Sequence, residues 1–154
     1  MKSLAFALLA VIVTLTTLAI AQDMPVVDPT ITTMSNDELV AARQAAMKED
    51  GRLLNGASVA RGDDAIKSAT IMLQNFTNFP ALFREGSITY KSHALPIIWE
   101  QWDQFEGLLK KGQAAAADMQ ARAEADDHEG YAGALQTLGG LCKQCHETYR
   151  QPGD

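Results

Sequence analysis

The sequence predicts an all-α protein built as an antiparallel four-helix bundle. Four stretches of the 154-residue chain carry apolar residues at steps of three and four, the periodicity of amphipathic helices. Alternation of apolar and polar residues, the pattern of a strand, never extends beyond a few positions. Short links join the first stretch to the second and the third to the fourth, which favours antiparallel neighbours.

The first 21 residues have the layout of a secretory signal peptide. A positive start at Lys2 precedes an apolar run from Leu4 to Ile20, and Ala19-Ile20-Ala21 forms a small-x-small cleavage site. The alternative is an uncleaved membrane anchor, but the apolar run is near the lower length limit for a span. We therefore expect residues 1–21 to be removed, leaving an exported domain of residues 22–154 without a membrane span.

The exported domain is acidic. Lys2 is the only charged residue of the leader, so the remaining chain carries 12 Lys and Arg against 19 Asp and Glu. No basic stripe is left to bind nucleic acid or an anionic membrane surface. The charge therefore argues against nucleic-acid partners.

The first helix is expected to follow an extended lead-in at residues 22–33, which contains Pro25 and Pro29. Ser35 and Glu38 have the spacing of a capping box, and the helix is predicted to run to about Ala60. Its neighbouring faces carry Leu39, Arg43, Ala46, Met47, Leu54 and Ser58.

The other three helices are predicted at residues 63–77, 96–125 and 126–150. Pro96 suits the first turn of the third helix. The connection at residues 78–95 is unusually long for a small bundle, which suggests that it covers something.

The chemistry of the chain is concentrated in its last helix. Cys142, Cys145 and His146 form the C-x-x-C-H signature of c-type haem attachment. Positions i, i+3 and i+4 share one helix face, so the two thiols reach the two vinyl groups of one porphyrin and the imidazole reaches the iron. The sequence predicts a bundle with one covalent haem c.

Other interpretations of the cysteine pair are weaker. A disulfide across a two-residue gap closes too small a loop to stabilise the fold much. A zinc site needs two more ligands, for which only His93 and His128 remain, and both are expected to be exposed and inert. A thiol–disulfide redox motif is expected beside a βαβ unit, which is absent.

The chain from about Asp37 to Arg150 resembles the cytochrome c-prime family, whose haem motif lies in the last helix. The residues that carry the resemblance are the C-x-x-C-H-E-T-Y-R ending at Arg150, the Pro-x-x-Trp at Pro96–Trp99 and the Arg-Gln of the first helix. The resemblance implies a periplasmic location, a frequent homodimer, and either electron transfer or binding of gases such as nitric oxide.

The resemblance also implies roles for further residues. Arg43 and Gln44 correspond to positions beside the haem propionates and rim, and Arg150 to the basic residue on the histidine side. Ordinary solvated positions are the alternative for Arg43, and a cation at a helix C-terminus is the alternative for Arg150. A dimer is expected to use a second apolar face of the first helix, which carries Val40, Ala41, Leu53 and Val59.

Whether Met47 binds the iron distinguishes two possible functions. It corresponds to the position facing the sixth site of the iron, where low-spin members ligate a methionine and high-spin members leave the iron open. A thioether ligand raises the potential and saturates the iron, which favours electron transfer. Methionine is also a common gap-filler, so packing alone stays an alternative.

We therefore predict a periplasmic electron carrier, with redox partners unspecified. The alternative is a five-coordinate protein that binds nitric oxide or carbon monoxide. An enzyme such as a peroxidase is disfavoured, because the open side of the haem offers no acid–base set beyond Arg43.

Overall fold

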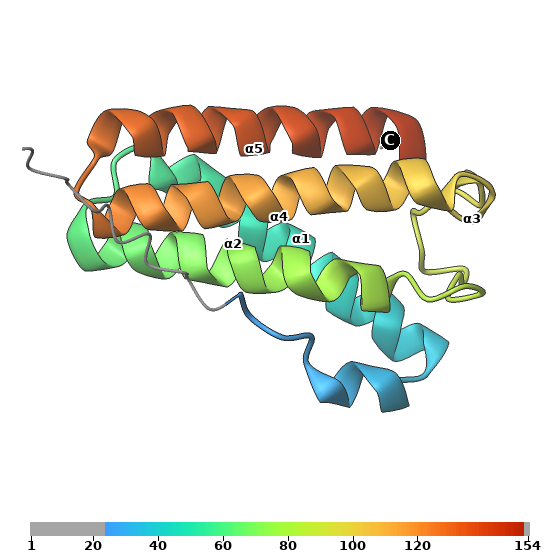
Figure 1. The fold of residues 1–154 in the computed structure, drawn as a ribbon. Coiled ribbons are helices and arrows are strands. Elements are labelled where there is room, and N and C mark those ends of the chain that lie inside the picture. Colours follow the sequence, from blue (N-terminus) through green and yellow to red (C-terminus); the bar gives the residue numbers. More distant parts are fainter. Residues whose placement is uncertain (1–23, 153–154) are drawn as a thin grey trace, which may run out of the picture.

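A computed structural model describes residues 24–152, which form a bundle of four long helices (Figure 1). The elements are η1 (Pro29–Thr33), α1 (Asn36–Ala57), α2 (Gly62–Leu82), α3 (Ile97–Glu100), α4 (Trp102–Glu124) and α5 (His128–Tyr149). Successive long helices run antiparallel, and the described part of the chain contains no strand, which confirms the predicted fold class. The predicted signal peptide lies outside the described residues. Within residues 24–152, no helix has both the length and the apolar character needed to cross a membrane.

The capping signals set the helix starts. The Glu38 carboxylate accepts a 2.7 Å hydrogen bond from the backbone N–H of Ser35, whose hydroxyl accepts in turn from the Glu38 N–H, so the predicted capping box is confirmed. At the start of α5, Asp127 accepts from the N–H of Gly130 at 2.9 Å. These caps satisfy backbone donors that have no partner within the helix.

Two predicted boundaries are wrong. α2 does not end at residue 77 but continues through Pro80 to Leu82. The proline removes one backbone donor close to the helix end, and burial of Phe79 and Leu82 offsets that loss. The third predicted helix is interrupted at Gln101 (φ −120°, ψ 38°), which separates α3 from α4.

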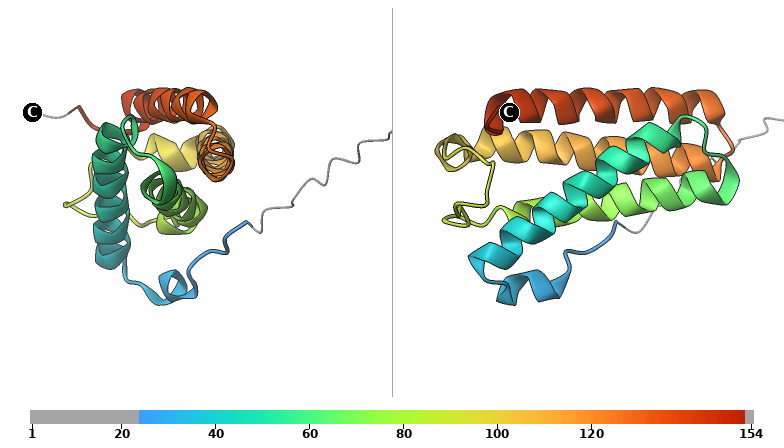
Figure 2. Two further views of the ribbon diagram at one scale, coloured as in Figure 1. Left: turned by 90° about the vertical axis from the view of Figure 1, so that its left-hand side faces the viewer. Right: turned by 180° about the vertical axis from the view of Figure 1, so that it is seen from behind.

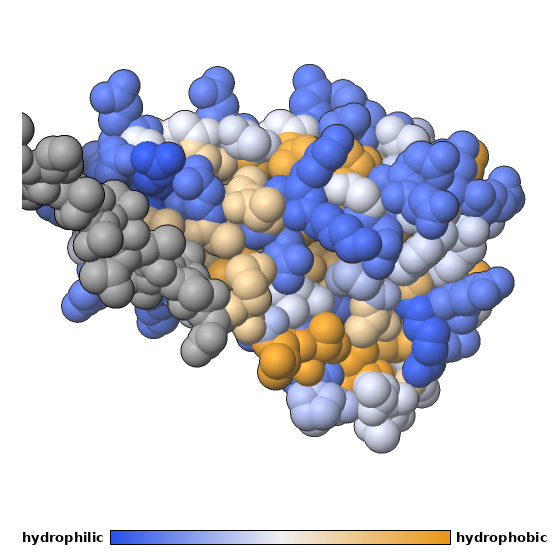
Figure 3. Space-filling model, in the orientation of Figure 1, coloured by the Kyte–Doolittle hydropathy of each residue, from blue (hydrophilic) through white to orange (hydrophobic). Residues whose placement is uncertain are grey.

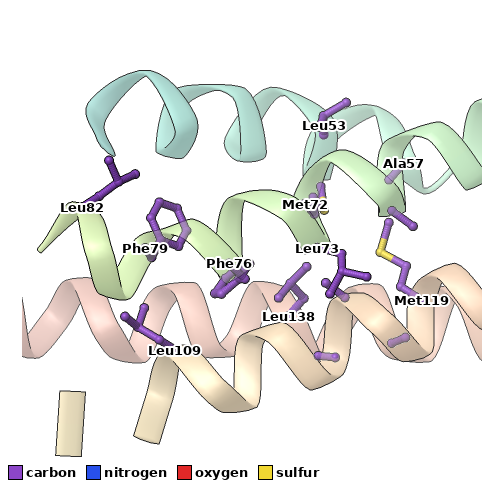
Figure 4. Packing of buried hydrophobic residues seen from close by; sticks show 14 of the residues in the cluster. Leu53, Ala57, Met72, Leu73, Phe76, Phe79, Leu82, Leu109, Met119 and Leu138 are labelled. Carbon is purple, nitrogen blue, oxygen red and sulfur yellow. The ribbon is translucent and has the colours of Figure 1, made fainter. Parts of the chain in front are cut away.

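The core lies between α2, α4 and α5, with α1 laid across one side. Figure 4 shows Phe76 and Leu73 of α2 beside Leu138 of α5, and Leu109 of α4 on the side of Phe79. Gly112 of α4 is packed so closely against the Phe76 ring that a β-carbon there would overlap it.

The helices α1 and α5 are spread apart. α4 packs along its length against both α2 and α5, whereas α1 crosses α2 obliquely and makes few contacts with α5 (Figure 2). This arrangement leaves space between α1 and α5 near the C-terminal end of α5. The cavities described below occupy that space.

The predicted dimer face of α1 is partly wrong. Val40 and Leu53 are buried in the core of this chain, so they are not available to a second copy. Val59 is exposed but stands apart from them at the end of the helix. On the side shown in Figure 3, apolar surface gathers instead over the lead-in before α1, where Met24, Val26 and Val27 are exposed.

Candidate functional site

Two adjoining cavities lie between α1 and α5. The outer one has a volume of about 400 Å³ and the inner one about 80 Å³. Met47 of α1 and Cys145 and His146 of α5 line both cavities, so these three side chains mark the place where the two meet. A methionine, a cysteine and a histidine from facing helices therefore converge on one space.

Every site residue predicted from the sequence lines one of these cavities. Arg43, Gln44 and Arg150 line the outer cavity, and Cys142 lines the inner one. Further ionisable residues line the cavities and were not assigned to the site from the sequence: His93, Lys48 and Tyr149 at the outer cavity and Asp50 at the inner one. His93 is exposed as expected, but its place in the long connection was a reason to include it.

The connection at residues 83–96 covers the outer cavity and is held from two helices. From α1, Arg43 donates to Ser87 and Ser92, and Gln44 donates a 2.8 Å hydrogen bond to the carbonyl of Lys91. Beside α5, a backbone bridge joins Ala94 to Arg150. The connection that the sequence marked as a cover is thus tied to both walls of the cavity.

Arg43 is a buried cation without a carboxylate partner among the described residues. It is 2 % exposed, and its guanidinium lies 4.6 Å from the ring centroid of Phe83. Burial lowers the pKa of Arg43 to about 10, so it stays charged at neutral pH. A buried charge is costly unless an opposite charge compensates it. Its position in the cavity wall therefore favours an anionic group inside the cavity.

The two cysteines are free, half-buried thiols beside the inner cavity. Burial, with a smaller effect of nearby Asp50, raises the pKa of Cys142 to about 11, and burial also raises that of Cys145 to about 11. Thiol–disulfide exchange needs a thiolate, which these thiols do not supply near neutral pH. Among residues 24–152, no group of three or more His, Cys, Asp and Glu side chains is arranged to hold a metal ion by itself.

His146 lies on the same face of α5 as the two cysteines. Partial burial, and then the positive charge of Arg150, lower the pKa of His146, which favours the neutral imidazole that binds iron. Most other residues of the inner cavity are apolar: Gly51, Leu54, Phe76, Phe79, Leu108, Leu109 and Leu141. Two vinyl-reactive thiols, an imidazole, an apolar interior and an uncompensated cation together fit a haem with its carboxylates.

Comparison with known proteins points in the same direction. The family model described as Cytochrome C' matches residues 37–150. Cytochrome c-556 of Agrobacterium tumefaciens (strain II Chrys) is 37% identical over 118 residues, covering 72% of this chain and 95% of the relative. Cytochrome c' of Pararhodospirillum photometricum is 32% identical over 124 residues, covering 76% and 99%.

The fold is also similar to that of solved structures. The crystal structure of cytochrome c' from Thermochromatium tepidum superposes with a TM-score of 0.70 at 19% identity, covering 77% of this chain and 98% of the other. At this identity the likeness concerns the fold. It agrees with the four-helix arrangement described above.

Proposed function

The chain belongs to the cytochrome c′ family and is a monohaem c-type cytochrome with one haem c, and on this premise we propose that it is a periplasmic electron carrier. The observation that carries the proposal is the convergence of Met47 and His146 where the two cavities meet. A thioether and an imidazole together saturate the iron and raise its potential, as suits a carrier.

The haem is attached, in this proposal, at Cys142 and Cys145 with His146 as an axial ligand. Mass spectrometry of the mature protein is expected to show one haem that stays with the chain after acid–acetone extraction. Haem that is extracted, or no haem, would contradict the assignment of these residues.

The bound haem supplies an iron that gains and loses one electron. With a haem bound, the apolar side chains of the inner cavity, among them Leu54 and Phe76, would keep water away from the iron. Arg43 supplies positive charge at the outer cavity, and the covering connection forms part of the wall of that cavity. We assign no catalytic role, because Arg43 is committed to the covering connection and offers no acid–base pair with another residue.

An optical spectrum tests the carrier function directly. With Met47 bound to iron, the ferric protein is expected to be low-spin, with a weak far-red sulfur-to-iron charge-transfer band. Carbon monoxide should bind the reduced protein slowly, because it must displace the thioether. A high-spin ferric spectrum with fast carbon monoxide binding would contradict this assignment.

That opposite result is the expectation of a second function, the binding of small gases. In that function Met47 would serve only in packing, and it is among the partly buried side chains that pack against the core. The nitric oxide complex of a cytochrome c prime variant from Alcaligenes xylosoxidans is similar in fold to this chain, with a TM-score of 0.67.

The periplasmic location rests on residues 1–21. Sequencing of the mature protein from a periplasmic extract is expected to give Gln22 as the first residue. A chain that retains Met1 in the membrane fraction would identify the leader as an anchor instead.

We also propose a homodimer. A structurally similar cytochrome c' is described as undergoing ligand-controlled dimer dissociation. Sedimentation at micromolar concentration should show a dimer, and a monomer alone would contradict the proposal. Because Val40 and Leu53 are buried, their substitution is not a test of the interface.

A further inference from the structure

The two cavities differ in charge. The side chains around the outer cavity include Arg43, Lys48, His93 and Arg150, and no Asp or Glu. The inner cavity is lined by apolar residues and by one carboxyl group, that of Asp50. A ligand carboxylate is therefore attracted to the outer cavity, while the inner one offers it low polarity and a second acid.

Arg43 has little capacity left to bind a ligand. One terminal nitrogen donates to the Leu82 carbonyl at 3.0 Å and to the Ser87 hydroxyl at 2.9 Å. The other donates to the Ser87 carbonyl at 2.8 Å and to the Ser92 hydroxyl at 2.9 Å. A guanidinium has five N–H donors, so only the Nε–H remains. The planar fork that pairs with a carboxylate is occupied by the covering connection.

Lys48 and Arg150, in contrast, have free side chains. Both are exposed, and neither forms a salt bridge or a side-chain hydrogen bond within residues 24–152. Lys48 is on α1, and Arg150 follows α5. The Arg150 backbone is fixed because Leu95 donates to the Tyr149 carbonyl at 2.9 Å and Gln151 donates to the His93 carbonyl at 2.8 Å. The outer cavity thus has an available cation on each of its two walls.

The position of the cysteines orients the haem. Cys142 lines only the inner cavity, and the vinyl groups that cysteines attack lie on the porphyrin edge away from the two propionates. Attachment there directs the hydrocarbon edge inward and the carboxylate edge outward. We propose that Lys48 and Arg150 hold the two haem carboxylates, and that Arg43 holds the covering connection and does not bind a carboxylate. This inference rests on the attachment proposed above.

The test compares Lys48→Gln and Arg150→Gln with Lys67→Gln, which removes the same charge from an exposed position on α2. All three side chains are exposed, so each holoprotein should fold. Loss of a cation leaves a carboxylate uncompensated, which favours ferric iron. Each of the two site variants should therefore shift the redox equilibrium toward the oxidised form by roughly two- to fivefold, as expected for exposed ion pairs. The Lys67→Gln variant should not.

The charge of Arg150 also acts on His146, so a redox shift in Arg150→Gln does not by itself identify a haem carboxylate as its partner. Redox-difference infrared spectra observe the carboxylates directly and provide the second readout. Carboxylate bands should move in Lys48→Gln and Arg150→Gln and stay in place in Lys67→Gln. Arg43→Lys should leave these bands in place but speed hydrogen exchange of the amides at residues 83–95. Bands that move only in Arg43→Lys, or site variants that match Lys67→Gln, would overturn the proposal. Absence of covalent haem from the wild type would instead overturn the proposed attachment.

Discussion

The side-chain amide of Asn75 on α2 donates a 2.7 Å hydrogen bond to the buried carboxyl group of Asp50 on α1. Asp50 is 5 % exposed, and burial raises its pKa to about 7, although the hydrogen bond from Asn75 acts in the opposite direction. An acid that faces the inner cavity thus changes its charge near neutral pH.

The Asp50→Asn variant should lose part of the pH dependence of stability. The folded-state pKa of Asp50 lies above its ordinary value of 3.8, so the folded state holds the proton more tightly than the unfolded state. The resulting stabilisation is complete below about pH 4 and is lost as the pH rises through 7, with a total effect of about 4 kcal/mol. Urea unfolding of both holoproteins at pH 5 and pH 8 measures the difference. If both proteins lose the same free energy of unfolding between pH 5 and pH 8, the assigned burial of Asp50 is contradicted.

Removal of either cysteine should leave the haem attached by one bond. In Cys142→Ser or Cys145→Ser, one vinyl group stays conjugated with the porphyrin, so the reduced pyridine haemochrome band should move to longer wavelength. The double variant should release its haem into acid acetone. Lys143→Gln is the matched control, because Lys143 lies between the cysteines but is exposed. A wild-type band in either single variant would exclude that cysteine from attachment.

Gly112→Ala should destabilise the holoprotein by about 1–3 kcal/mol, since the added methyl group overlaps the Phe76 ring. Phe76 lines the inner cavity, so its displacement should also perturb the haem spectrum. Gly107→Ala on the same helix meets no atom within 4 Å and should gain up to about 1 kcal/mol from helix propensity. Thermal unfolding followed by circular dichroism compares the two. Similar effects at both positions would argue against the close contact.

The features that the sequence predicted well are local. The apolar periodicity, the Ser35–Glu38 capping box and the spacing of Cys142, Cys145 and His146 each depend on residues within a few positions of one another. A helix presents such residues on one face wherever it packs. The four-helix class and the shared face of the haem motif therefore followed without knowledge of tertiary contacts.

The features that were missed depend on contacts between distant segments. Arg43 meets Ser87 and Ser92 only because the covering connection folds back onto α1, and no local pattern specifies that path. Burial of Phe79 and Leu82 decides that α2 continues past Pro80, against local propensity. Val40 was assigned to the wrong environment for the same reason, because an apolar face does not indicate which partner covers it.

The last prediction concerns Met47 and distinguishes the carrier from the gas binder. If its sulfur binds iron, Met47→Leu should give a high-spin, five-coordinate haem with a lower reduction potential and faster carbon monoxide binding. The two side chains have similar volumes, so packing should change by less than about 1.5 kcal/mol, and ligation is left as the cause of a large spectral change. Met119→Leu is the control, because Met119 is fully buried and lines neither cavity. If the wild type is already high-spin and both variants resemble it, Met47 serves only in packing, and gas binding becomes the better-supported function.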